Sequence, residues 1–140
     1  MQGLVVDFGG VLAGPGSDRA GLTAIIGALR AVGVRSAILS NDPGGPAGAD
    51  LRGLGNGVLV DEVVLSGDVG MAKPDPRIYR LTADRLGLAP KDCVFVDDLA
   101  VNVRGAAASG MVGVHHVAPE ATATELRILF DLGQGVPVQW

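Results

Sequence analysis

The residues in this sequence that could do chemistry stand directly after apolar runs. The run Leu4–Val6 leads into Asp7. The run Cys93–Val96 leads into Asp97 and Asp98. Runs of this kind are typical of central parallel strands that are covered on both faces. Because ligands bind at the carboxyl ends of the strands in open parallel sheets, we expect the three carboxylates to share that edge.

Other polar groups are expected at the same edge. The apolar run at residues 36–39 leads into Ser40 and Asn41, and Lys73 stands on a loop before Pro74. Three neighbouring carboxylates repel unless their charge is offset, either by Lys73 and solvent alone or by a bound cation. Carboxylate oxygens are ligands of hard cations such as Mg²⁺, and we favour the cation.

Alternating strands and helices must position these side chains. Strands are predicted at residues 4–6, 36–39, 62–66, 93–96 and 112–114. The first helix follows Ser17 or Asp18 as its N-cap and ends before Gly33. Its buried side is predicted from four apolar residues at helical spacing, namely Leu22, Ile25, Ile26 and Leu29. The alternation indicates an α/β fold, a doubly wound parallel sheet of about five strands.

The middle of the chain is harder to assign. Residues 42–57 are rich in glycine and proline, with at most a short helix from Ala49 to Leu54, and residues 67–72 are predicted as a loop. Asp75 is a good N-cap and Pro76 a good first helical residue. We expect the buried side of that helix to contain Ile78, Tyr79, Leu81 and Leu86.

Two helices are predicted near the end of the chain. One runs from about residue 102 to 109, and Thr122 and Glu125 have the spacing of a capping box that opens the other. The inward side of the last helix is expected to hold Leu126, Leu129 and Phe130. Residues 133–140 are interpreted as a tail, with Trp140 packed either on this domain or on a neighbouring subunit.

Composition limits the class of protein. The 140 residues are 48% hydrophobic, which favours one domain spanning residues 1–140. The net charge of -4 argues against binding to nucleic acid or to an anionic membrane. Cys93 has no partner for a disulfide and is interpreted as a small buried hydrophobic residue. No signal peptide or membrane span is evident, so we expect a soluble cytoplasmic protein.

Four segments together resemble the ordered motifs of the haloacid dehalogenase (HAD) superfamily. They are Asp7-Phe8-Gly9-Gly10-Val11-Leu12, Leu39-Ser40-Asn41, Gly70-Met71-Ala72-Lys73-Pro74-Asp75-Pro76-Arg77-Ile78-Tyr79 and Val94-Phe95-Val96-Asp97-Asp98. Within the superfamily the details are most similar to the branch that holds the phosphatase domain of soluble epoxide hydrolase and the sugar-1-phosphate phosphatases. The resemblance implies a HAD-like Rossmannoid core and a Mg²⁺-dependent phosphomonoesterase that acts on a small phosphorylated metabolite.

The resemblance also implies roles for the residues that match the motifs. Asp7 would be the nucleophile that forms an aspartyl-phosphate. Ser40, Asn41 and Lys73 would bind the substrate phosphate. The protein ligands of Mg²⁺ would be drawn from four positions, namely Asp7, the Gly9 carbonyl, Asp98 and the adjacent Asp97. Asn102 stands where relatives carry a residue that supports the metal site.

The sequence departs from the family pattern in two ways. Most family phosphatases carry an acid two residues after the nucleophile, which protonates the leaving oxygen, whereas this chain has Gly9 there, as some members of the resembling branch do. The segment Ala13–Asp18 is too short to hold the cap domain that relatives insert at this point. Without a cap we expect either a homodimer that covers the site or an open cleft, and we favour the homodimer.

Alternative functions remain at this point. A 2-haloacid dehalogenase uses the same aspartate without metal, which the Asp97-Asp98 pair disfavours. A catalytically weak binding or assembly module is the non-enzymatic alternative. His115 and His116 are neighbours at the end of a strand, so their side chains should point to opposite faces and cannot share one metal.

Overall fold

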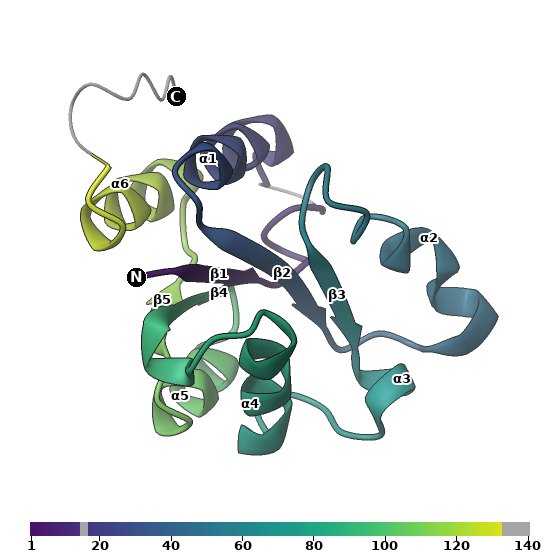
Figure 1. Cartoon of the computed structure of the whole chain (residues 1–140). Coiled ribbons are helices and arrows are strands. Elements are labelled where there is room, and N and C mark those ends of the chain that lie inside the picture. Colours follow the sequence, from purple (N-terminus) through teal and green to yellow (C-terminus); the bar gives the residue numbers. More distant parts are fainter. Residues whose placement is uncertain (15–16, 133–140) are drawn as a thin grey trace.

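Five parallel strands form one sheet in the order β3-β2-β1-β4-β5 (Figure 1). The computed structural model describes residues 1–14 and 17–132. The strands are β1 (Gly3–Val6), β2 (Arg35–Ser40), β3 (Glu62–Leu65), β4 (Cys93–Asp97) and β5 (Val112–His115). Chain order reverses between β1 and β4, which lie side by side. This confirms the predicted doubly wound parallel sheet.

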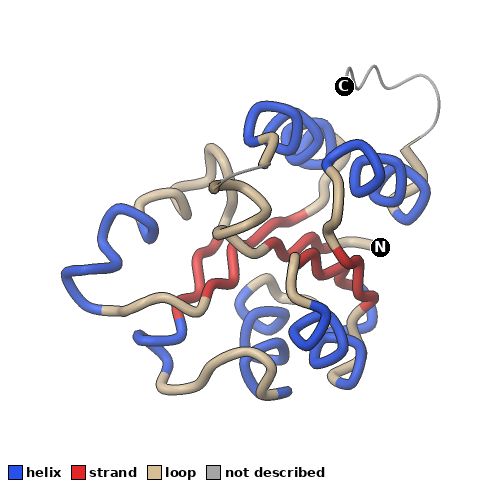
Figure 2. Tube along the Cα trace, turned by 180° about the vertical axis from the view of Figure 1, so that it is seen from behind, coloured by secondary structure: helices blue, strands red, loops and turns tan. Residues whose placement is uncertain are grey.

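Helices cover both faces of this sheet. On one side lie α1 (Arg19–Ala31) and α6 (Pro119–Leu129), and on the other lie α4 (Pro76–Arg85) and α5 (Ala100–Ala108) (Figures 1 and 2). Four shorter helical segments complete the described elements: η1 (Gly45–Gly48), α2 (Ala49–Arg52), α3 (Ser66–Val69) and η2 (Pro90–Asp92). The segment with η1 and α2 lies beyond β3, away from α5 (Figure 1).

An apolar core lies on each face of the sheet, which explains why the central strands are apolar without interruption. Along β1, Leu4 packs with the α1 and α6 side and Val5 packs with the α4 side. Tyr79 and Phe95 meet edge to face on the α4 side, with ring centroids 5.2 Å apart. Cys93 is buried in the same cluster as predicted, and burial raises the pKa of its thiol to about 11.

Helix boundaries follow the expected capping residues at two helices. The Asp18 carboxylate accepts a hydrogen bond from the Gly21 backbone N–H and begins α1. Gly33, with φ of +89°, follows the C-cap of that helix. Asp75 accepts from the Arg77 N–H and begins α4, with Pro76 in the first helical position. The buried face of α1 is the one predicted.

The predicted capping box at Thr122 and Glu125 is wrong. Helix α6 begins at Pro119, three residues before Thr122, because a proline fits the first turn, where its missing N–H would have no helical partner. Thr122 is therefore inside the helix, and its buried hydroxyl is 2.7 Å from His116 Nδ1.

Other predicted elements shift by less. The loop predicted at residues 67–72 begins as the helical turn α3, and α5 begins two residues before Asn102. Leu81 and Leu129 are only partly buried. The connection from β1 to α1 spans residues 7–18, so no additional domain is inserted there. Every helix within residues 1–14 and 17–132 is too short or too polar to cross a lipid bilayer. The predicted tail, including Trp140, lies outside the described residues.

Candidate active site

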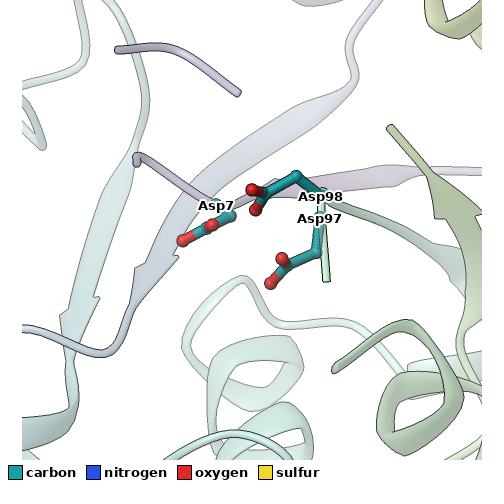
Figure 3. A group of neighbouring side chains, drawn as sticks. All are labelled: Asp7, Asp97 and Asp98. Atoms are coloured by element: carbon teal, nitrogen blue, oxygen red, sulfur yellow. The ribbon is translucent and has the colours of Figure 1, made fainter. Parts of the chain in front are cut away.

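Asp7, Asp97 and Asp98 converge at the carboxyl edge of the sheet (Figure 3). Each offers a carboxylate oxygen, and these three oxygens lie within 4.8 Å of one another. The register of β1 and β4 brings these residues together, because Val6 pairs with Val96 and the next residue of each chain segment is an aspartate, Asp7 or Asp97. The site therefore occupies the point where strand order reverses, the usual position for a ligand in this architecture.

Lys73 joins two of these carboxylates. Its Nζ lies 2.9 Å from Asp7 Oδ1 and 2.8 Å from Asp97 Oδ2, and it also donates to the Leu39 carbonyl at 3.0 Å. The residue is 6% exposed. A lysine ammonium has three donors, and these contacts use all of them. Lys73 is thus fixed beside the Asp7 carboxylate at the centre of the site.

Asn41 holds the loop that carries Lys73. Its Nδ2 donates to the Lys73 carbonyl at 3.1 Å, and its Oδ1 accepts from the Lys73 backbone N–H at 2.9 Å. This two-point contact ties the end of β2 to a loop 32 residues further along the chain. The predicted contact of Asn41 with substrate phosphate stays a prediction, and the contact with Lys73 was not anticipated from the sequence.

The two neighbouring aspartates differ in their surroundings. Asp97 is fully buried, and its Oδ2 accepts from Lys73 and from Asn102 Nδ2, while its Oδ1 accepts from the Leu99 N–H. Asp98 is partly exposed, and its side chain accepts no hydrogen bond from any residue within 1–14 and 17–132. Asp98 therefore keeps its oxygens available to a cation, whereas Asp97 holds Lys73.

Gly9 and Gly10 shape the turn beside Asp98. Gly10 has φ of +83°, and a Cβ at this position would collide with the Asp98 carboxylate. Glycine is the residue that reaches this conformation without strain. Gly9 differs, because a Cβ added there would meet no atom within 4 Å. Only Gly10 is required by the local geometry.

The charge at this edge is unbalanced. Three carboxylates and the Lys73 ammonium carry a formal charge of -2 when all are ionised. Burial raises the pKa of Asp7 from 3.8 to about 6, an effect that Lys73 opposes and the charge of Asp97 reinforces. A divalent cation would neutralise the remaining charge, and oxygens are the ligands that Mg²⁺ prefers. The donor set therefore fits Mg²⁺.

Ser40 ends β2 on the neighbouring strand, as predicted, and is buried. Its hydroxyl donates a hydrogen bond to Asp42 Oδ2. The Asp42 carbonyl accepts from the Ser66 hydroxyl and the Gly67 N–H, which fixes this loop against α3. Asp42 was not identified from the sequence, although its position two residues after Ser40 is a local signal that could have found it.

The two histidines point to opposite sides, as predicted. His115 is exposed, with Nε2 2.9 Å from the Asp98 carbonyl. His116 is buried against Thr122, and its backbone N–H donates to the Asp97 carbonyl. The recorded contact of each ring is with a group other than the three carboxylates.

Comparison with known proteins adds to this geometry. Residues 3–110 match the family model described as haloacid dehalogenase-like hydrolase. Acyl-CoA dehydrogenase family member 10 of Mus musculus is 37% identical over 83% of this chain, which spans 11% of that protein. Phosphoglycolate phosphatase of Rhodospirillum rubrum is 37% identical over 65% of this chain, which spans 38% of that protein.

A solved structure resembles nearly the whole chain. The crystal structure of an uncharacterised protein from Corynebacterium glutamicum is 40% identical, with a TM-score of 0.90. The match covers 97% of this chain and 99% of that one. Nearly the whole fold therefore has a counterpart in one solved protein of similar length.

Proposed function

Because the chain belongs to the haloacid dehalogenase-like hydrolases, we propose that it is a Mg²⁺-dependent phosphomonoesterase acting on a small phosphorylated metabolite. The main observation is the Asp7 carboxylate, which lies within 4.8 Å of two further carboxylates and is bound on one oxygen by Lys73. The similarity to a phosphoglycolate phosphatase supports phosphoryl chemistry. We also propose that residues 1–140 form a single hydrolase core of the epoxide hydrolase phosphatase and sugar-1-phosphate phosphatase branch.

In this proposal Asp7 acts as the nucleophile. Its carboxylate oxygen forms a bond to phosphorus while the bond between phosphorus and the leaving oxygen breaks, which gives an aspartyl-phosphate. Water then attacks the phosphorus, releases inorganic phosphate and regenerates Asp7. Lys73, already 2.9 Å from Asp7, and Ser40, on the next strand, hold the non-bridging oxygens of the phosphoryl group. To do so, Lys73 exchanges its hydrogen bond to Asp7, and Ser40 its hydrogen bond to Asp42, for one to the phosphoryl group.

Asp7, Asp98 and the Gly9 carbonyl would hold Mg²⁺, which when bound offsets the repulsion between the carboxylate and the phosphoryl oxygens. Asp97, the fourth predicted ligand, already accepts three hydrogen bonds, from Lys73, Asn102 and the Leu99 N–H, and its carboxylate keeps one lone pair for a metal. Its role in the proposal is to position Lys73.

A panel of phosphoesters assayed with and without Mg²⁺ tests the proposal. We expect phosphate release that stops when the metal is chelated and returns when Mg²⁺ is added. Release of chloride from 2-chloropropionate by chelated protein would indicate a dehalogenase instead. A folded protein that turns over neither class of compound would indicate a binding or assembly module.

A further inference from the structure

A cavity of about 390 Å³ lies beside the proposed phosphoryl site. It is partly open and is lined by the turn after β1, the start of α1 and the segment after β2 that contains η1 and α2. The volume falls within the range of sites that bind small organic molecules. The apolar part of its wall includes Phe8, Pro43, Leu51 and Leu54.

The chain sequence and one hydrogen bond connect this cavity to the phosphoryl site. Phe8 directly follows the proposed nucleophile Asp7 in the chain. Asp42, another wall residue, accepts the hydroxyl hydrogen bond of Ser40. Two wall residues, Phe8 and Asp42, are thus directly joined to Asp7 and Ser40, so a phosphoryl group held between Asp7 and Ser40 would lie near the cavity.

The charged wall residues leave the apolar surface available. The Asp42 carboxylate is already bound by Ser40, and the Arg19 guanidinium lies over the Phe8 ring, 5.7 Å from its centroid. Asp50, which also lines the cavity, is exposed to solvent. The side chains that remain to contact an organic group are mainly Phe8, Leu51 and Leu54, each partly buried and packed against the core.

We propose that this cavity is the leaving-group pocket and selects phosphomonoesters whose organic group is apolar. The inference rests on the proposed phosphatase function and adds the class of substrate. Polyol and sugar phosphates of similar size would lose hydration of their hydroxyl groups against Leu51 and Leu54 without gaining equivalent hydrogen bonds.

The test compares ethyl, butyl and hexyl phosphate, whose leaving alcohols have nearly equal acidity. Each fully buried methylene should raise kcat/KM about fourfold. Allowing for partial burial, we expect hexyl phosphate to exceed ethyl phosphate by more than tenfold, and to exceed sorbitol 6-phosphate, which also has six carbons. Equal kcat/KM values along the alkyl series would overturn the proposal.

Variants inside and outside the cavity wall test whether this cavity causes the dependence on chain length. Leu51→Asn should remove most of the dependence on chain length, while Val58→Asn should keep it, since Val58 is 80% exposed in the following loop and does not line the cavity. Leu54→Asn provides a second pocket variant if the first does not fold. A chain-length dependence that survives in every folded pocket variant would place apolar selection elsewhere and refute the assignment.

Binding of alkylphosphonates separates this inference from the proposed function. These compounds are not hydrolysed, and ¹H–¹⁵N spectra of a 14.1 kDa protein can report their dissociation constants and the amides they perturb. Suppose that hexylphosphonate binds more than tenfold tighter than ethylphosphonate and loses this advantage in Leu51→Asn, while no phosphoester is turned over. The proposed pocket is then supported and the proposed phosphatase function is refuted. Equal binding of the two phosphonates refutes the pocket whether or not the protein is a phosphatase.

Discussion

A carboxyl group introduced at Gly9 should supply the leaving-group acid that the site lacks. Gly9 is exposed, a Cβ built there meets no atom within 4 Å, and its φ lies outside the left-handed region. Gly9→Asp therefore introduces a side chain without collision or backbone strain. The proposed metal contact at this position is the backbone carbonyl, which the substitution retains.

The size of the effect depends on the leaving group. A positioned general acid typically contributes 10²–10⁴-fold to a rate. An alkoxide leaves poorly without a proton, so kcat/KM of Gly9→Asp for hexyl phosphate should rise by about 10²-fold or more on that scale. A nitrophenolate leaves readily without one, so the corresponding value for p-nitrophenyl phosphate should change much less. Among esters whose organic groups fit the pocket equally well, the wild-type protein should accordingly prefer aryl, acyl or anomeric phosphates to alkyl phosphates.

The assay is kcat/KM for both esters, because this quantity covers the steps up to departure of the leaving group and excludes later hydrolysis of the aspartyl-phosphate. Gly9→Asn is the matched control, since it adds a side chain of the same size that cannot act as an acid near neutral pH. Gly10→Asp is a second control, expected to damage the site because of the positive φ and the collision with Asp98.

Two results would refute this reasoning. If Gly9→Asp and Gly9→Asn change the rate with hexyl phosphate equally, then the effect comes from side-chain bulk. If the wild-type protein hydrolyses hexyl and p-nitrophenyl phosphate at equal rates, then another group already protonates the leaving oxygen, and Asp42 in the cavity wall is the first residue to substitute.

Four further predictions follow from the site and the fold. Asp7→Asn should keep less than a few per cent of phosphatase activity with an unchanged circular dichroism spectrum, and higher activity would remove Asp7 as nucleophile. Asp98→Ala should raise the Mg²⁺ concentration needed to restore chelated protein, measured by Mg²⁺ titration; an unchanged requirement would exclude Asp98 as a ligand. Burial alone would raise the pKa of Asp61, but the Ser36 N–H and the Arg30 guanidinium hold this pKa below the ordinary 3.8. Asp61 therefore stabilises the fold above about pH 4, and this stabilisation is lost as the pH falls through the lowered pKa. Asp61→Asn should therefore lower the free energy of unfolding at pH 7 by about 1 kcal/mol, allowing for its partial exposure, and the difference should shrink near pH 3; a difference that is independent of pH would contradict it. Size exclusion with light scattering should show a homodimer at high micromolar concentration, and a strict monomer would exclude coverage of the site by a second subunit.

Sequence patterns correctly predicted the elements that are determined by residues close together in the chain. The apolar runs before Asp7, Ser40 and Asp97 identified β1, β2 and β4, and parallel pairing then required their ends to meet. Two helix starts were identified from Asp75 and from the pair Ser17 and Asp18, of which Asp18 is the N-cap, because an N-cap acts within three residues of itself.

The errors came from competition between local signals. Thr122 and Glu125 have capping-box spacing, but Pro119 begins the helix earlier, and burial of Thr122 against His116 gives the hydroxyl another partner. Residues 66–69 include a glycine and still form a helical turn, which ends at its C-cap Gly70 with φ of +70°.

Contacts between distant segments could not be predicted from sequence patterns. The hydrogen bonds from Asn41 to the Lys73 backbone depend on the path of a 32-residue connection. The same connection carries η1 and α2 past β3 and forms the cavity wall at Leu51 and Leu54. The glycine and proline content of residues 42–57 indicates a loop, and only the fold shows which side chains that loop presents to the site.

This connection also bears on the absence of a cap. A lid usually excludes water and completes the environment of a small substrate, and residues 7–18 are too few to supply one. The segment from Asp42 to Leu54 supplies apolar side chains from the adjacent strand end instead, within the same chain. Ser40, proposed to bind phosphate, is hydrogen-bonded to Asp42 in the cavity wall, so the two proposed binding regions are in direct contact. Specificity in this chain can therefore reside in the core itself, so a second subunit would add shielding from water without being needed to distinguish one leaving group from another.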